Sequence, residues 1–248
     1  MPLPFKRCIV VGASSGMGEA IARQLCREGA TVALVARRAD ELARLKGEIA
    51  AAGGKALVFP HDVRDYQAVE ALFQQITAHM EGLDLMVYAA GVMPLIEPDE
   101  YSLDKDLLTV EVNCMGAVAW LNQAAQRFGR EGAGTIVGIS SVAGDRGRRG
   151  FPVYGASKSF LDAYLESLRN RIARTGASVV TVKPGPVDTP MTKDVAKKPL
   201  LISAETAADT ILKAAAASKR VVYVPWKWRP IMAIIRAIPS FIFRKLNF

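Results

Sequence analysis

Residues 140–158, SSVAGDRGRRGFPVYGASK, bring together side chains that could move a proton. Tyr154 and Lys158 form the pattern Y-x-x-x-K, so on a helix both side chains project from one face. An ammonium beside a phenol favours the phenolate and lowers the phenol pKa from its usual ~10. Such a tyrosine can give a proton to an oxygen and take it back, which is what reduction of a ketone requires.

A glycine-rich turn near the N-terminus suits a different task. The sequence VVGASSGMGEA places Gly12, Gly16 and Gly18 between an apolar run and a helical pattern. Glycines at a strand-to-helix turn let the backbone bend tightly and approach a pyrophosphate, whose charge lies at the helix N-terminus. A turn that merely needs glycine is the alternative, but the position between a first strand and an amphipathic helix favours dinucleotide binding.

The end of the second apolar run bears on which dinucleotide would bind. In LVARRADEL, Ala36 stands where NAD enzymes usually have an acid that bonds the ribose 2′-hydroxyl, and Arg37 and Arg38 follow it. A 2′-phosphate needs cationic donors instead. The pattern therefore predicts NADP(H), with a solvated pair of loop arginines as the alternative.

Short β-branched runs alternate with helical patterns along the chain and must position these residues. Helical spacing of apolar residues recurs between the runs, for example over 18–28 and 68–80. The alternation predicts an α/β fold in one domain over residues 1–225, a doubly wound, seven-stranded parallel sheet with helices on both faces. The expected strands are 6–11, 31–36, 55–60, 83–90, 134–140, 178–184 and 221–224.

Taken together, G-x-x-x-G-x-G, Y-x-x-x-K and KPGPVDTPM resemble the short-chain dehydrogenase/reductase family over roughly residues 6–224. The resemblance implies a Rossmann-like oxidoreductase that reduces a small-molecule carbonyl to a secondary alcohol with NADPH, with Tyr154 as acid and base. It also implies that Ser141 bonds the substrate oxygen and that Asn113 completes a proton relay through water to Lys158. A non-catalytic dinucleotide-binding scaffold or sensor is the alternative, but a scaffold needs no such relay.

The resemblance also implies a cofactor site. Arg37 and Ser14 would bind the 2′-phosphate, and Arg38 would stack on the adenine. Asp62 and Val63 would hold the adenine, and the segment from Pro184 to Thr189 would fix the nicotinamide amide. The full set implied is Gly12, Ser14, Ser15, Gly16, Met17, Gly18, Arg37, Arg38, Asp62, Val63, Ala90, Gly91, Pro184, Gly185, Val187 and Thr189.

One departure from the family pattern lies in YAAG, residues 88–91, where N-N-A-G is more frequent. Tyr88 and Ala89 replace asparagines whose side chains brace the central sheet. We expect this departure to affect stability more than chemistry.

The loop between Ser141 and Tyr154 is unusually cationic, with Arg146, Arg148 and Arg149 in DRGRRG. Guanidinium groups match phosphate oxygens bidentately, so the loop favours a phosphate-bearing substrate. The alternative is a set of salt bridges to Asp145, Asp188 or a neighbouring subunit.

The charge of the chain is concentrated at its C-terminus. All 24 acidic residues lie at or before Asp209 together with 24 of the 32 basic residues, so the later part supplies the whole net charge of +8. Within residues 226–248, WKWRPIMAIIRAIPSFIFRKLNF, Ile231, Ile234, Ile235 and Ile238 are expected on one helical face, with a helix start at Pro230 and a break at Pro239.

The cationic, aromatic and aliphatic character of residues 226–248 predicts an interfacial amphipathic segment on an anionic membrane surface. An arm that covers the site or joins subunits is the alternative, and nucleic acid has no use for so many large aliphatics. This segment and the arginine-rich loop are locally similar to the reductase subunits of decaprenylphosphoryl-ribose epimerases, which act on a keto-sugar carried on a polyprenyl phosphate.

Composition excludes some classes of protein. Three cysteines and two histidines without paired spacing support neither disulfides nor a metal site. The N-terminus has too little apolar length for a signal peptide. We expect a cytoplasmic protein, peripheral to the inner face of the membrane where its tail binds, and the family resemblance implies a homodimer or homotetramer built on helices around 104–128 and 152–174.

Overall fold

Seven parallel strands form the central sheet of the computed structural model, which describes residues 3–97, 99–195 and 197–246. Residues 1–2 of the expected domain and residues 247–248 of the expected C-terminal segment lie outside the described residues. The strand order is β3-β2-β1-β4-β5-β6-β9, so the predicted doubly wound sheet is confirmed. Its strands are β1 (Arg7–Val11), β2 (Thr31–Ala36), β3 (Lys55–Pro60), β4 (Leu85–Tyr88), β5 (Thr135–Ile139), β6 (Ser178–Pro184) and β9 (Val221–Val224).

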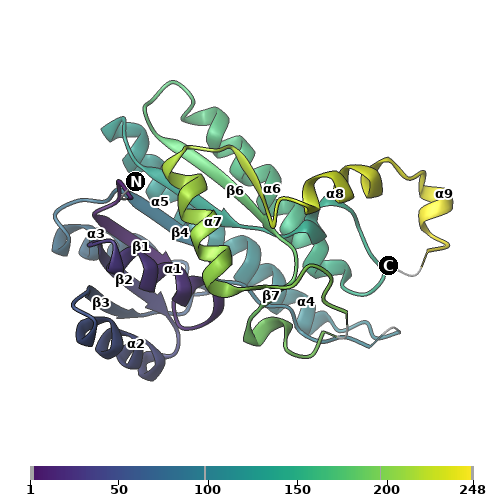
Figure 1. Cartoon of the computed structure of the whole chain (residues 1–248), viewed down its shortest axis with the longest axis horizontal. Coiled ribbons are helices and arrows are strands. Elements are labelled where there is room, and N and C mark those ends of the chain that lie inside the picture. The colour runs from purple at the N-terminus through teal and green to yellow at the C-terminus, as the bar shows by residue number, and fades with distance from the viewer. Residues whose placement is uncertain (1–2, 98, 196, 247–248) are drawn as a thin grey trace.

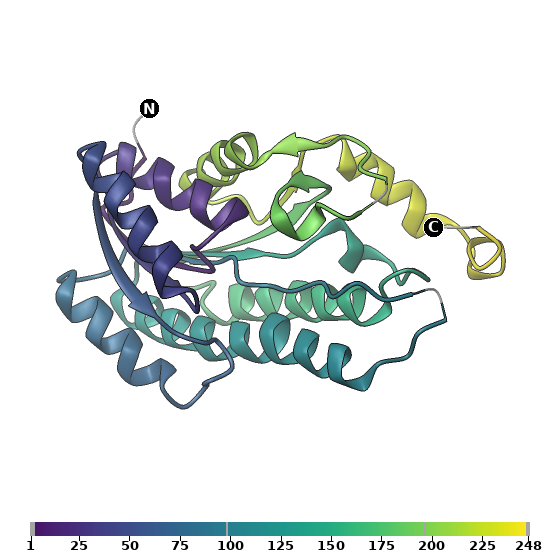
Figure 2. The ribbon, with the colours of Figure 1, turned by 90° about the horizontal axis from the view of Figure 1, so that it is seen from below.

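Helices cover both faces of this sheet (Figures 1 and 2). A second, two-stranded sheet of β7 (Val187–Asp188) and β8 (Ile202–Ser203) was not expected from the sequence. The helices are α1 (Gly16–Arg27), α2 (Ala39–Ala51), α3 (Val69–His79), α4 (Leu103–Val110), α5 (Gly116–Glu131), α6 (Pro152–Arg171), α7 (Ala204–Ala216), α8 (Trp228–Ala237) and α9 (Ser240–Phe243). The short turns are η1 (Glu111–Met115), which is π-helical, and the 3₁₀ turns η2 (Val142–Asp145) and η3 (Pro190–Thr192).

Alternation along each strand divides the core into two layers. In β1, Cys8 and Val10 belong to the cluster under α1, α2 and α7, whereas Ile9 and Val11 belong to the cluster under α3, α5 and α6. Successive side chains of a strand point to opposite faces, so each apolar run serves both layers. This double burial explains why the strands read as continuous apolar runs.

Tyr88 supplies a brace where the family pattern has asparagine. Its side chain is fully buried at the end of β4, and its hydroxyl donates a 2.6 Å hydrogen bond to the carbonyl oxygen of Val112 in η1. Gly116 makes room for it, because a Cβ there would lie 2.6 Å from the phenol oxygen. The lost asparagine contacts are therefore replaced by a tie between the sheet and the turn that carries Asn113.

The C-terminal segment forms an arm beyond the sheet, with α8 and α9 in yellow in Figure 1. Trp228, Met232 and Ile235 of α8 are buried against Val142 of η2. Ile231, Ile234 and Ile235 have the expected spacing on α8, but the buried face of this helix is a different one, since Ile234 is 68% exposed. The buried face follows the i, i+4, i+7 spacing that starts from the large indole of Trp228.

The limits of the arm's helix also differ from the expected ones. α8 begins at Trp228, two residues before Pro230, and ends before Pro239, as predicted for the break. Within the described residues, no helix is long and apolar enough to cross a membrane.

Replacing Tyr88 with Phe should lower the free energy of unfolding by about 1–2 kcal/mol, because a buried carbonyl loses its donor. The matched control is Tyr66→Phe, since the Tyr66 hydroxyl reaches the Glu111 carbonyl of the same π-helical turn at only 3.5 Å. Urea unfolding of both variants gives the comparison. Equal losses of unfolding free energy in the two variants would contradict a stabilising role for the hydrogen bond from Tyr88 to Val112.

Candidate active site

The glycine turn after β1 is closed by contacts that leave no space for side chains. Gly12 has φ +89° and Gly16 has φ +56°, a region that L-residues rarely adopt. A Cβ on Gly18 would overlap the carbonyl oxygen of Gly12, and one on Gly12 would lie 2.5 Å from the amide nitrogen of Ala90. The turn therefore packs directly on the end of β4, and α1 begins at Gly16 with its free N–H groups at this turn.

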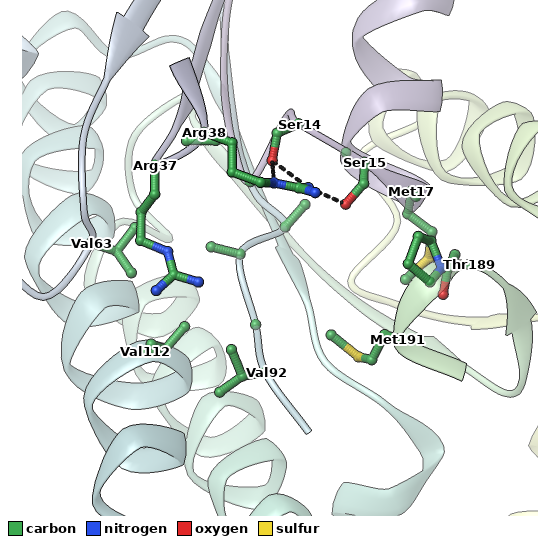
Figure 3. Close-up of a pocket in the computed structure, with 18 of the residues that line it drawn as sticks. Ser14, Ser15, Met17, Arg37, Arg38, Val63, Val92, Val112, Thr189 and Met191 are labelled. Carbon is green, nitrogen blue, oxygen red and sulfur yellow. Dashed lines mark hydrogen bonds between the residues drawn. The ribbon is translucent and has the colours of Figure 1, made fainter. Parts of the chain in front are cut away.

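A cavity opens beside this turn, where the carboxyl ends of β1, β2 and β4 meet (Figure 3). Twelve of the predicted cofactor residues line it: Gly12, Ser14, Ser15, Gly16, Met17, Gly18, Arg37, Arg38, Val63, Ala90, Gly91 and Thr189. The lining also includes residues that the sequence analysis did not assign to the site: Ala36, His61, Ala89, Val92, Val112, Pro190 and Met191. Many of these are immediate chain neighbours of predicted residues, and that adjacency is the signal that could have found them.

The two arginines after β2 extend in different directions. Arg38 donates to the Ser14 hydroxyl at 2.8 Å and to the Ser15 hydroxyl at 2.8 Å. Arg37 instead extends along the cavity toward Val63 and Val112 (Figure 3). Ser14 is therefore hydrogen-bonded to Arg38, and the joint binding of a 2′-phosphate by Ser14 and Arg37 stays a prediction.

Four predicted cofactor residues do not line the cavity. Asp62 turns to Arg64, with 2.7 Å between Oδ2 and the guanidinium, and this contact holds the pKa of the Asp62 carboxyl below its usual value. Val187 is buried in the core. Pro184 ends β6, and a Cβ on the next residue, Gly185, would overlap the indole of Trp228.

Tyr154 and Lys158 both lie in the first turns of α6, as predicted. The Lys158 ammonium lies 5.7 Å from the centroid of the Tyr154 ring and donates to the carbonyl oxygen of Ile139 at 3.0 Å. Burial lowers the pKa of Lys158 to about 8. Near neutral pH its ammonium is therefore retained, but its proton is held less firmly than on an exposed lysine.

The expected depression of the Tyr154 pKa is not what the structure gives. Burial raises the pKa of Tyr154, and a hydrogen bond with Ser141 acts in the opposite direction. The ammonium of Lys158 donates to the Ile139 carbonyl oxygen and lies over the Tyr154 ring. Desolvation of the phenolate therefore outweighs the hydrogen bond with Ser141.

Ser141 lies at the carboxyl end of β5, at the N-terminus of η2. Its hydroxyl accepts from the amide of Ala143 at 3.1 Å and lies 3.5 Å from the carbonyl oxygen of Pro184. The side chain is therefore held between β5 and β6, beside the phenol of Tyr154.

Asn113 is fully buried in η1 and fixes the backbone of Val92 through both ends of its amide. Its Oδ1 accepts from the Val92 amide at 2.8 Å, and its Nδ2 donates to the Val92 carbonyl at 3.0 Å and to the Ser157 hydroxyl at 3.0 Å. A Cβ on Gly91 would lie 3.4 Å from Asn113 Oδ1 and 3.5 Å from Lys158 Nζ. Asn113 and Lys158 therefore flank the same glycine.

The side chains of the three loop arginines make contacts with different parts of the structure. Arg146 donates to the carbonyl oxygens of Ile235 and Ile238 at 2.8 and 2.5 Å, and its guanidinium lies 4.1 Å from the centroid of the Phe243 ring. Arg148 packs on Met232, with 3.7 Å from Nη2 to the sulfur. Arg149 is 68% exposed, and its 3.9 Å contact is with an exposed aspartate. None of the described ion pairs joins these arginines to Asp145 or Asp188.

Comparison with known proteins agrees with this geometry. The family model for the short chain dehydrogenase matches residues 6–200. An uncharacterized oxidoreductase of Mycobacterium tuberculosis is 31% identical over 239 residues, which are 96% of each chain. The glycine betaine reductase of Emericella nidulans is 41% identical over 184 residues, or 74% of this chain, and the match spans 14% of that protein's length.

Solved structures give the same result. A short-chain type dehydrogenase/reductase of Mycobacterium ulcerans superposes with a TM-score of 0.81, 26% identity and 88% coverage of each chain. A variant of actinorhodin polyketide ketoreductase, determined with NADPH, has a TM-score of 0.80 and 28% identity over 88% of this chain and 95% of that one.

Proposed function

The chain belongs to the short chain dehydrogenase family of oxidoreductases, and on that premise we propose that it reduces a ketone to a secondary alcohol with NADPH. The observation that carries the proposal is the meeting of Ser141, Tyr154 and Lys158 at one edge of the sheet, near the glycine-lined cavity. A dinucleotide-binding scaffold would need the cavity but not these three side chains.

The cavity fits a dinucleotide on physical grounds. Its floor is a turn in which Cβ atoms at Gly12 and Gly18 would clash with neighbouring backbone, and this bare turn leads into the start of α1, whose free N–H groups would bind a pyrophosphate. Ser14, Arg37 and Arg38 would hold the 2′-phosphate and the adenosine, and Thr189 would contact the nicotinamide end. When bound, NADPH supplies the hydride.

The chain's own residues would handle the oxygen and its proton. Ser141 would donate a hydrogen bond to the carbonyl oxygen of the substrate, and Tyr154 would transfer its phenolic proton to that oxygen as negative charge develops there. Lys158 would stabilise the resulting phenolate by its charge, and Asn113 would stand on the route by which a proton returns. The raised pKa of Tyr154 keeps the phenol protonated before reaction, as a reductase requires.

We also propose a boundary at residue 225 between a catalytic domain, 1–225, and an arm, 226–248. The inner face of the arm is buried, but its outer surface carries exposed apolar and basic side chains together. Trp226, Ile234, Phe241 and Ile242 are 71%, 68%, 62% and 43% exposed. The exposed basic residues are Lys227, Arg229, Arg236, Arg244 and Lys245.

An anionic membrane surface suits this outer face, because aromatic and aliphatic side chains enter the headgroup region while arginines and lysines stay near phosphates. The proposed substrate class is therefore a keto compound, such as a keto-sugar, that is presented at a membrane. A phosphate on that substrate would have to bind Arg148 or Arg149, since Arg146 is engaged by the arm.

A homodimer or homotetramer is proposed as the assembly. Leu103, Leu107 and Val110 of α4 are 71%, 49% and 39% exposed, and Phe160 of α6 is 43% exposed. An apolar surface on these helices matches the family expectation for subunit contacts.

NADPH should bind more tightly than NADH, and Arg37→Asp or Arg38→Asp should remove the preference, a loss of about 1–3 kcal/mol in charge-assisted hydrogen bonding. Fluorescence titration measures both affinities. Arg130→Asp, at an exposed position on α5, is the matched control and should leave them unchanged. Equal affinities for the two dinucleotides in the unmutated chain would contradict the NADPH assignment.

Tyr154→Phe should lower kcat by ~10²-fold or more while NADPH affinity stays the same, because only the proton donor is removed. NADPH oxidation is followed by absorbance with a panel of ketones, including cyclohexanone and ethyl acetoacetate. An unmutated chain that binds NADPH but reduces no ketone would favour the scaffold, and a Tyr154→Phe variant of normal rate would exclude Tyr154 as the acid.

The full chain should float with phosphatidylglycerol vesicles at low salt, and less so as salt rises, because each basic residue near the surface contributes ~1 kcal/mol. The double variant Ile234→Ser/Phe241→Ser should lose flotation without unfolding, since both side chains are exposed. Tyr101→Ser, at a 97% exposed position outside the arm, is the control. Absence of flotation by the unmutated chain would overturn the membrane proposal.

A further inference from the structure

Three charged side chains are buried together behind the loop that carries Ser141. The ammonium of Lys183 lies 2.5 Å from Asp145 Oδ1 and 2.9 Å from Asp162 Oδ2. The side chains of Lys183, Asp145 and Asp162 are 11%, 1% and 17% exposed. The hydroxyl of Tyr223 donates to the other oxygen of Asp145 at 2.8 Å. We call Asp145, Asp162 and Lys183 the buried triad.

Each member of the buried triad is close in sequence to a residue of the proposed site. Asp145 ends η2, whose N-terminus is Ser141. Asp162 lies one helical turn after Lys158 on α6, and Lys183 immediately precedes Pro184 at the end of β6. The triad therefore ties together three segments that must keep their spacing for the site to exist.

The backbone of η2 packs directly against α6, with no space between them for an additional side-chain atom. A Cβ on Gly144 would lie 2.8 Å from Asp162 Oδ2 and 2.8 Å from the carbonyl carbon of Lys158. The hydroxyl of Ser159 donates to the carbonyl oxygen of Gly144 at 2.6 Å. A shift of η2 would therefore move Ser141 relative to Lys158.

Burying such a triad is costly for stability. Two carboxylates and one ammonium leave one net negative charge away from water, and apolar residues of similar volume are often equally or more stabilising. Positioning and local electrostatics are what an ion triad supplies and an apolar cluster does not.

Resting on the proposed reductase function, we propose that the buried triad is a positioning unit for the site. It fixes Ser141 against α6, and its net negative charge helps Lys158 to keep its proton. Asp145, Asp162 and Lys183 do not touch the reacting atoms in this arrangement. They act through Ser141 and Lys158.

The charge effect has a definite sign. Burial lowers the pKa of Lys158 to about 8, and the carboxylate of Asp162 opposes that change. Cys114 faces Lys158 from η1 and acts in the same direction as Asp162. Around Asp162 itself stand Lys158 on its own helix, Asp145 from η2 and Lys183 from β6. Removing the Asp162 charge should therefore lower the pKa of Lys158 further.

The test compares Asp162→Asn, which keeps the side-chain volume, with Asp209→Asn, which alters an exposed ion pair of 2.8 Å on α7. NMR titration of ¹³C-labelled lysine follows Lys158, whose signal is assigned with Lys158→Met. We expect Asp162→Asn to move the Lys158 midpoint to lower pH and to lower kcat at pH 8 relative to pH 6 by roughly threefold or more. Asp209→Asn should change neither.

Asp145→Asn and Tyr223→Phe test positioning apart from the Lys158 charge. Each should lower kcat by roughly fivefold or more with NADPH affinity unchanged, because Ser141 loses its fixed place while the cavity does not. Tyr223→Phe removes one hydroxyl and keeps the ion pairs of the buried triad. It therefore still tests positioning if Asp145→Asn fails to fold.

An unchanged Lys158 midpoint in Asp162→Asn would overturn the charge role. A lower melting temperature with unchanged kcat in Asp145→Asn and Tyr223→Phe would show that the triad is only structural. The NMR titration needs neither cofactor nor substrate, so an unmutated chain without reductase activity would contradict the proposed function separately.

Discussion

Parallel pairing of β1, β4, β5 and β6 is the constraint on which the rest of the structure depends. Parallel hydrogen bonding brings the carboxyl ends of these strands to one edge of the sheet, so the segments that follow them meet there. Gly12, Ala90, Ser141 and Pro184 are far apart in the chain, yet each follows or ends one of these strands. The cavity and the meeting of the candidate proton-transfer residues both follow from that shared edge.

Burial sets the chemistry at this edge. It raises the pKa of Tyr154 and lowers the pKa of Lys158, so the phenol keeps its proton while the ammonium of Lys158 holds its proton less firmly. The same desolvation makes the nearby charge of Asp162 more effective than it would be in water. Site residues and the charged residues behind them therefore form one electrostatic system.

The arm binds one arginine of the loop that was expected to bind phosphate. Arg146 lies in a loop whose composition favours phosphate, yet its guanidinium donates to the carbonyl oxygens of Ile235 and Ile238 at the end of α8, where a cation is also favoured by the helix dipole. Trp228 and Met232 meanwhile cover Val142, next to Ser141. The arm is thus joined to the segment that carries a proposed catalytic serine.

Sequence alone predicted the positions of the seven strands along the chain and their parallel pairing. It also predicted the glycine turn and the placement of Tyr154 with Lys158 on one helix. These features depend on short-range periodicity and spacing. Long-range contacts decided the rest. Tyr88 braces Val112, Arg38 donates to Ser14, and Arg146 binds the arm. Asp145, Asp162 and Lys183 met only on folding, since partners up to 38 residues apart carry no local pattern that marks them as a unit.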